Sequence, residues 1–139
     1  FYELSADEKR IDLQLRGEGA LHGDRLMLRR ALGNLISNAL RHTPSEGTVS
    51  VEIAKDRAQL RIKVENTGEP IPEAHLARFF ERFYRGDPAR QHGVGEGAGL
   101  GLSITRAITR AHGGEVSAAS SNGVTSFLLT LPLEIHQSE

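Results

Sequence analysis

Two carboxamide side chains spaced four residues apart stand out in this sequence because their types and spacing could serve a polar ligand. Asn34 and Asn38 belong to the stretch NLISNALRHTP, residues 34–44. Positions four apart stack on one face of an α-helix, so the two amides would point the same way, with Arg41 and His42 about one turn further on. Apolar residues fill the opposite face, a pattern typical of a helix that lies between a core and a ligand.

A glycine-rich run is the second feature that could do chemistry. Residues 93–102 read GVGEGAGLGL and come just before a helical pattern. Glycines let a backbone approach a ligand closely, and the N–H groups of such a run, with the helix N-terminus that follows, can hold phosphates. Taken together with the carboxamide helix, this run indicates a nucleotide site.

Both features also have simpler interpretations, which the sequence leaves open. Two Asn residues four apart occur by chance on solvated helix surfaces. A run rich in glycine is often only a flexible loop. The nucleotide hypothesis therefore depends on a fold that brings the two features together at one site.

The elements that must position these residues follow from the hydrophobic pattern. Asp24 is a good N-cap for a long helix that carries both carboxamides and that Pro44 ends. Strict alternation predicts strands, and a period of 3.6 residues predicts helices. The expected strands cover residues 11–16, 48–53, 59–64, 115–119 and 125–131, the further helices cover residues 73–83 and 100–112, and a hairpin turn covers residues 55–57. Residues 85–97 mix Gly, Pro and charge, which predicts a mobile loop.

Composition narrows the classes of function. The 139 residues, 38% hydrophobic and 25% charged, fit one α/β or α+β domain with a sizeable core. The net charge of −1 gives no electrostatic reason to expect nucleic-acid binding. The absence of Cys excludes disulfides, thiolate zinc sites and cysteine nucleophiles. No apolar run approaches the roughly 20 residues of a membrane-spanning helix. Since the sequence begins at Phe1 without an initiator Met, we expect a fragment of a longer protein.

Five short motifs in a fixed order carry a family resemblance. Residues 34–44 match the N box, 64–72 take the place of the first glycine box, 78–85 match the F box, 97–104 match the second glycine box, and 123–127 form a weakened third. With these motifs the chain resembles the ATP-binding catalytic domain of two-component sensor histidine kinases, in the superfamily shared with gyrase and MutL. The amino-acid sequences of the N box and of the NTGEPIP variant are most similar to those of heavy-metal sensor kinases, such as the copper and silver sensors.

The resemblance implies the architecture and the cofactors. The expected fold is α+β, a two-layer sandwich in which a mixed sheet packs against three helices and ATP binds under a flexible lid. Residues 1–139 would form one catalytic domain. The expected cofactors are ATP and Mg²⁺, and the expected activity is that of a protein-histidine kinase.

The resemblance also assigns roles within the N box. Asn38 takes the principal magnesium position, and its side-chain oxygen would coordinate the ion directly or through water. Asn34 would support it from one turn earlier, where related ATPases carry a Glu that activates water. Because an amide cannot act as a general base near neutral pH, Asn34 favours phosphoryl transfer to a protein acceptor over hydrolysis. Arg85, the first residue of the expected lid, would help to stabilise the transferring phosphate or bind the partner domain.

The nucleotide itself would be held by residues from all the motifs. The expected contacts are Asn34, Asn38, Arg41, His42, Asn66, Gly68, Ile71, Tyr84, Gly97, Gly99, Leu100, Gly101, Leu102 and Thr125. Asn66 stands where most family members place an Asp that accepts a hydrogen bond from the adenine amino group, so that contact should be weaker here. For His42, nucleotide contact and a simple helix-end histidine favoured by the macrodipole remain equal alternatives.

No histidine in the chain fits the phosphoacceptor pattern, in which Glu or Asp follows the His and a Pro comes a few residues later. The expected partners are therefore the protein's own dimerisation and phosphoacceptor domain, and a response regulator. The full protein would be a membrane-bound homodimer, with this chain as a cytoplasmic domain of an inner-membrane sensor.

Two other functions remain possible at the level of sequence. One is a free-standing kinase of the anti-sigma type, which has the same superfamily fold and phosphorylates a protein Ser. The other is a degenerate binding module that no longer binds ATP, which the departures Asn66, Pro70, Ala98 and Val124 favour. Asn38 and the GLGL run argue against that second alternative.

Overall fold

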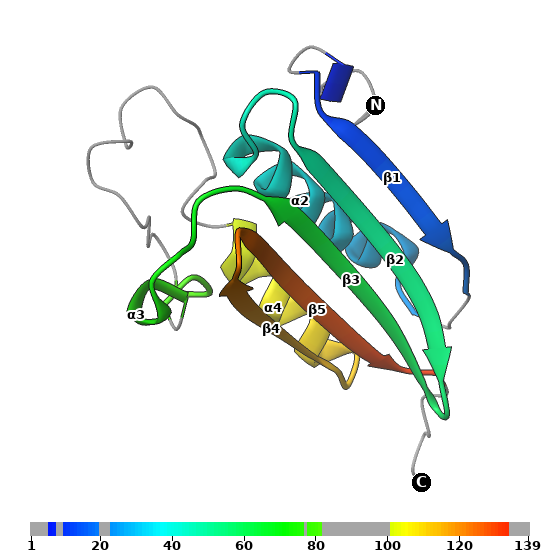
Figure 1. Cartoon of the computed structure of the whole chain (residues 1–139). Coiled ribbons are helices and arrows are strands. Elements are labelled where there is room, and N and C mark those ends of the chain that lie inside the picture. Colours follow the sequence, from blue (N-terminus) through cyan, green and yellow to red (C-terminus); the bar gives the residue numbers. More distant parts are fainter. Residues whose placement is uncertain (1–5, 8–9, 20–22, 77, 82–100, 134–139) are drawn as a thin grey trace, which may run out of the picture.

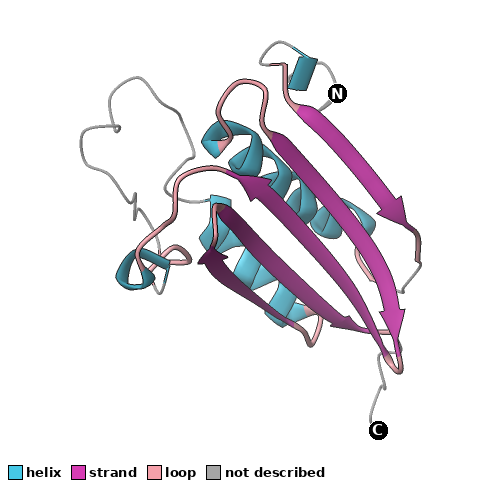
Figure 2. Ribbon diagram, in the orientation of Figure 1, coloured by secondary structure: helices cyan, strands magenta, loops and turns pink. Residues whose placement is uncertain are grey.

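The computed structural model describes residues 6–7, 10–19, 23–76, 78–81 and 101–133. In this part of the chain a five-stranded mixed sheet forms one layer and helices form the other (Figures 1 and 2). The elements are β1 (Asp12–Gly17), α2 (Arg25–His42), β2 (Thr48–Asp56), β3 (Gln59–Thr67), α3 (Glu73–Leu76), α4 (Gly101–Ala111), β4 (Glu115–Ser121) and β5 (Val124–Pro132). The strand order is β1-β2-β3-β5-β4, and β1 pairs with β2 in parallel while the other pairs are antiparallel. This confirms the expected α+β sandwich.

Helix α2 begins and ends where the sequence predicts. Asp24 is the N-cap, and its Oδ1 accepts a hydrogen bond from the Met27 N–H at 3.1 Å. At the other end Thr43 adopts an extended conformation, because the residue before a proline is disfavoured in the α region and Pro44 follows. The helix is therefore long enough to include both carboxamides.

Alternation along the strands builds the core between the two layers. In β5 every second residue from Thr125 to Leu131 is buried, and the neighbouring β3 buries Val64 against Phe127. Strand β2 continues to Asp56 and β3 to Thr67, beyond the predicted ends at residues 53 and 64. The hairpin turn accordingly lies at Arg57 and Ala58, with Arg57 at a φ of 59°.

The helix expected over residues 73–83 is confirmed at Glu73–Leu76 but not at residues 78–81, while residues 77, 82 and 83 lie outside the described residues. Helix α3 ends at Leu76, and turns follow. Two adjacent aromatic rings explain the early end. Phe79 stacks on Phe127 with ring centroids 6.3 Å apart, and Phe80 meets the same ring edge-on at 6.0 Å. Neighbouring residues on an α-helix diverge by about 100°, so both rings reach one partner more readily from a turn.

Helices α2 and α4 run in opposite directions and pack against each other. The N–H of Asp24, at the start of α2, donates to His112 Nε2 at 3.1 Å just after the end of α4. The His112 Nδ1 lies 2.9 Å from the carbonyl oxygen of Ile108, so the ring caps both helices. The C-terminal end of α2 and the first turn of α4 therefore lie at one end of the molecule, where β3 ends and β5 begins (Figure 1). No helix in the described ranges is long and apolar enough to cross a membrane.

Candidate functional site

The first carboxamide of α2 is anchored to the start of α4. Asn34 is half-buried, and its Nδ2 donates to the carbonyl oxygen of Gly101 at 3.0 Å. Because the amide nitrogen faces α4, its oxygen Oδ1 remains available as an acceptor. The structure thus joins the N box to the last glycine of the glycine-rich run, 67 positions later in the chain.

The second carboxamide, Asn38, is buried without a partner among the described residues. Its exposed fraction is 5%, and its amide makes no side-chain hydrogen bond to another described residue. At the same time, no fully buried side-chain nitrogen or oxygen in the described part of the chain lacks a partner. The small exposed area of Asn38 therefore includes its amide group. Burial of an unpaired amide costs stability, so this position resembles a site that waits for a ligand.

A second group of predicted residues gathers where α2 ends. Gly68 follows β3, and a Cβ at this position would lie 3.1 Å from the carbonyl oxygen of His42 and 3.6 Å from Asn66 Nδ2. Asn66 is 4% exposed, and its Nδ2 donates to the Thr67 carbonyl oxygen at 3.2 Å. Arg41 and His42 are both exposed in the last turn of α2. The fold therefore brings the end of the N box next to the first glycine box.

Thr125 and Ile71 join the same region through one hydroxyl. Thr125 is buried opposite Asn66 in the β3–β5 pairing. Its Oγ1 donates to Ser120 Oγ at 3.2 Å, and the N–H of Ile71 donates to the same Ser120 oxygen at 3.0 Å. This hydroxyl ties the segment after β3 to the β4–β5 hairpin.

Several predicted site residues lie outside the described residues. These are Tyr84, Arg85, Gly97, Gly99 and Leu100. The described end of the glycine run starts α4, where Gly101 faces Asn34 and Leu102 enters the core. The roles predicted for the five residues outside the described ranges stay predictions.

Two hydroxyl residues that organise this region were not predicted. Ser120 bridges Ile71 and Thr125, and Thr105 lies one turn into α4 beneath Gly101. A usable signal existed for Thr105, since a Thr four residues after a helix start often bonds back to that carbonyl group. Ser120 had no such signal, because its partners come from sequence-distant segments.

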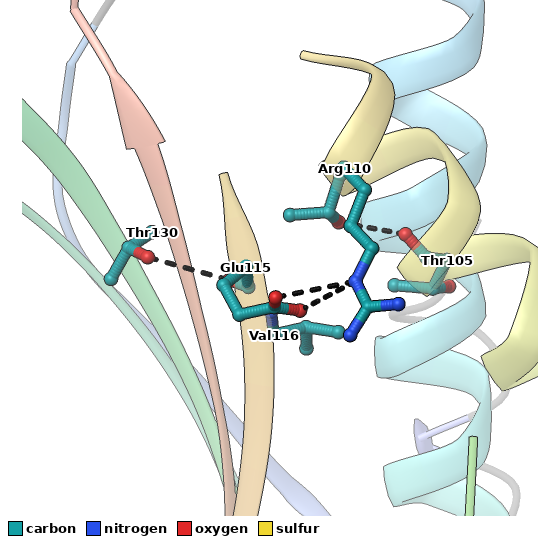
Figure 3. Close-up of polar contacts among 6 residues, drawn as sticks. Thr105, Arg110, Glu115, Val116 and Thr130 are labelled. Carbon is teal, nitrogen blue, oxygen red and sulfur yellow. Dashed lines mark hydrogen bonds and ion pairs between the residues drawn. The ribbon is translucent and has the colours of Figure 1, made fainter. Parts of the chain in front are cut away.

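The opposite end of α4 carries a charged pair. Figure 3 shows Arg110 on α4 beside Glu115 at the start of β4. The Arg110 Nε donates to the two Glu115 carboxylate oxygens at 3.1 and 3.2 Å. This hydrogen bonding lowers the pKa of Glu115, and the Val116 N–H, which donates to the same carboxylate, lowers it further. The pair ties helix to sheet at the end of α4 opposite Gly101, so it stands apart from the carboxamides.

Comparisons with known proteins show which proteins this sequence resembles. The sequence matches the family model described as histidine kinase-, DNA gyrase B-, and HSP90-like ATPase over residues 23–135. It is similar to the sensor histidine kinase CusS of Escherichia coli strain K12, with 46% identity over 133 residues that cover 95% of this chain. The same match covers only 28% of CusS, so the chain spans little more than a quarter of that relative.

Solved structures show the same fold. The catalytic domain of histidine kinase ThkA superposes with a TM-score of 0.82 at 26% identity, covering 95% of this chain and 85% of that one. ThkA in complex with response regulator protein TrrA gives 0.80 at 24% identity, covering 99% and 38%. Full-length ShkA in complex with AMPPNP gives 0.79 at 29% identity, covering 99% and 29%.

Proposed function

Since this chain belongs to the histidine kinase-, DNA gyrase B-, and HSP90-like ATPase family, as the catalytic ATP-binding domain of a sensor histidine kinase, we propose that it binds Mg²⁺-ATP and donates the γ-phosphoryl group to a histidine. That histidine belongs to a separate dimerisation domain of the same protein, and its phosphoryl group then passes to a response regulator. An imidazole nitrogen of the acceptor attacks the γ-phosphorus, the bond to the bridging oxygen breaks, and ADP leaves.

The observation that carries this proposal is Asn38, a residue only 5% exposed whose amide has no partner among the described residues. Asn34 lies one turn earlier and is already fixed on Gly101, so its oxygen can support a ligand without further reorganisation. The AMPPNP bound by the relative ShkA supports a nucleotide as that ligand.

The residues present fit a magnesium ion held jointly with phosphates. The described part of the chain has no group of three His, Asp or Glu side chains that could hold a metal alone. Mg²⁺ commonly binds through one or two protein oxygens together with phosphate oxygens and waters. Asn38 Oδ1 would supply the protein oxygen, and the bound ion would offset the charge of the transferring phosphate.

A neutral carboxamide at position 34 directs the proposed chemistry toward transfer. Its Nδ2 is committed to the Gly101 carbonyl oxygen, and an amide takes no proton from water near neutral pH. Asn34 thus positions groups but does not activate water. Without a docked imidazole the bound ATP should turn over slowly, because phosphoryl transfer depends on the position of the nucleophile.

The adenine end of the proposed site is formed by Asn66, Gly68 and Thr125, which lie beside the end of α2. The close approach of Gly68 to the His42 carbonyl oxygen leaves little room for a side chain there. Arg41, His42 and Ile71 flank this end. Tyr84, Gly97, Gly99 and Leu100 are proposed nucleotide contacts, and Arg85 a proposed catalytic group, outside the described residues.

The rest of the proposal concerns the longer protein. Residues 1–139 form its catalytic domain, and this domain lies in the cytoplasmic part of a homodimeric inner-membrane sensor. The response regulator bound by ThkA supports a regulator as the final acceptor. The similarity to CusS supports a metal sensor, whose sensory site would lie outside this chain.

Calorimetry with AMPPNP tests the proposal directly. We expect Mg²⁺-dependent binding to the wild type, loss of the Mg²⁺ dependence in Asn38→Ala, and unchanged binding in the neighbouring Ser37→Ala control. Adding the dimerisation domain and ATP should then yield acid-labile phosphohistidine on that domain. Absence of nucleotide binding by the folded wild type would refute the proposal and favour a degenerate interaction module.

A further inference from the structure

Thr105 occupies the contact between the two helices that frame the proposed site. Its side chain is fully buried, with an exposed fraction of 0%. The hydroxyl oxygen lies 3.0 Å from the carbonyl oxygen of Gly101 in its own helix and 3.2 Å from the carbonyl oxygen of Ala31 in α2. A single side chain on α4 therefore reaches a backbone acceptor on each helix.

We propose that Thr105 is a positioning residue, which fixes the first turn of α4 against the carboxamides of α2 and thereby sets the magnesium-dependent affinity for nucleotide. This inference rests on the function proposed above. Thr105 itself would touch neither nucleotide nor metal, because it is buried beneath Gly101.

The carbonyl oxygen of Gly101 is the point at which this network meets the site. It accepts from Asn34 Nδ2 at 3.0 Å and from the Thr105 hydroxyl at 3.0 Å. The oxygen of the same amide also lies close to this residue, since a Cβ at Gly101 would be 3.9 Å from Asn34 Oδ1. Displacement of the first turn of α4 would therefore turn the Asn34 amide as well.

The bond to Ala31 makes the network a link between helices. A hydroxyl has one proton, so Thr105 donates to one carbonyl oxygen at a time or shares the proton between both. Ala31 precedes Asn34 by three residues, which places both on the side of α2 that faces α4. Without the hydroxyl, only one of these hydrogen bonds, the one from the Asn34 amide, would still link α2 to α4 near the proposed site.

Thr109 supplies a closely matched control on the same helix. It too is 0% exposed, and its hydroxyl donates to the Thr105 carbonyl oxygen at 2.7 Å, within α4. Replacement by Val removes the same atoms from an equally buried position in each case. Only Thr105→Val removes a hydroxyl that reaches α2.

The experiment compares wild type, Thr105→Val, Thr105→Ser and Thr109→Val by calorimetry with AMPPNP, with and without Mg²⁺. We expect Thr105→Val to weaken binding about five-fold with Mg²⁺ and less than about twofold without it, the effect of one lost hydrogen bond. Thr105→Ser, which keeps the hydroxyl, and Thr109→Val should both stay within about twofold of wild type.

Thermal unfolding separates positioning from stability. The two Val variants should lose similar stability, since each loses one buried hydroxyl bond, and only Thr105→Val should lose magnesium-dependent affinity. Equal effects of the two Val variants on binding would overturn the inference while leaving the proposed function intact. Failure of the folded wild type to bind AMPPNP would instead refute the proposed function. If Thr105→Val does not fold, Thr105→Cys, which lacks the methyl group and has a weaker donor, takes its place under the same criteria, with Thr109→Cys as its control.

Discussion

Replacement of Asn38 by Leu should make the nucleotide-free protein more stable than the wild type. In the presence of Mg²⁺ and nucleotide, the variant should be less stable than the wild type. Asn38 has an exposed fraction of only 5%, and its amide has no hydrogen-bond partner among the described residues. Removal of such an amide recovers about 1 kcal/mol of desolvation cost, at the low end of the usual range because the group keeps some exposure. Leu also has a helix propensity better than Asn by about 0.5 kcal/mol.

These contributions predict a higher melting temperature for Asn38→Leu without nucleotide. For a domain of this length, a gain of about 1.5 kcal/mol raises Tm by about 5 °C. With Mg²⁺ and AMPPNP at about a hundred times the wild-type Kd, the wild type should gain about 2.7 kcal/mol, and the variant, which keeps only magnesium-independent binding, should gain less than about 1 kcal/mol. The order of the two melting temperatures should therefore reverse when ligand is added.

Differential scanning calorimetry with and without Mg²⁺-AMPPNP measures both shifts. Thr43→Val is the control, because that buried hydroxyl donates to the Ala39 carbonyl oxygen at 2.6 Å and its removal should lower Tm. A fall in Tm for nucleotide-free Asn38→Leu would refute the reasoning, since it would mean that the amide already contributes favourable interactions in the free protein.

Three further outcomes follow from described contacts. Gly114→Ala should destabilise the fold by more than about 2 kcal/mol in urea unfolding, because a Cβ there would overlap the Thr130 carbonyl oxygen; an unchanged midpoint would contradict this. Because Arg110 lowers the pKa of Glu115 below its ordinary 4.5, the carboxylate stabilises the fold above that pH and loses the effect as pH falls through the lowered pKa. The Tm difference between wild type and Glu115→Gln should therefore vanish in acid. A difference that stays constant with pH would disprove this stabilisation. His112→Leu should lower the free energy of unfolding by about 1 kcal/mol in urea, because the ring hydrogen-bonds at the ends of both helices. It should leave AMPPNP affinity within about twofold, since His112 lies roughly 15 Å along α4 from the proposed site. A larger loss of affinity would show that the far ends of the helices affect binding.

The sequence predicted the main elements because their signals are local. Asp24 marks the start of α2 by its own side chain, and alternation in β5 reports directly which residues face the core. The prediction was wrong for residues 78–81, where the packing of Phe79 and Phe80 on Phe127 outweighs a helical pattern. That packing depends on a strand more than 40 residues away, which no local period records.

The candidate site was predictable in its residue types but not in its contacts. The spacing of Asn34 and Asn38 placed both on one helix, as the structure has them. The hydrogen bond from Asn34 to Gly101 and the bridge through Ser120 join segments whose proximity only the fold establishes. Backbone carbonyl groups are the same at every position in a sequence, so a side chain's choice among them leaves no trace there.

The two ends of β3 separate the proposed nucleotide site from the β2–β3 hairpin. Asn66 lies near one end, and the Arg57–Ala58 hairpin lies at the other, roughly 25 Å away along the strand. An insertion in that hairpin would leave the end with the carboxamides unchanged, provided that the Ala58 carbonyl oxygen still accepts from the Leu133 N–H, a bond of 2.8 Å. The hairpin is therefore a natural place to attach a fluorescent reporter or a second module, and the sheet would act as a rigid spacer between them.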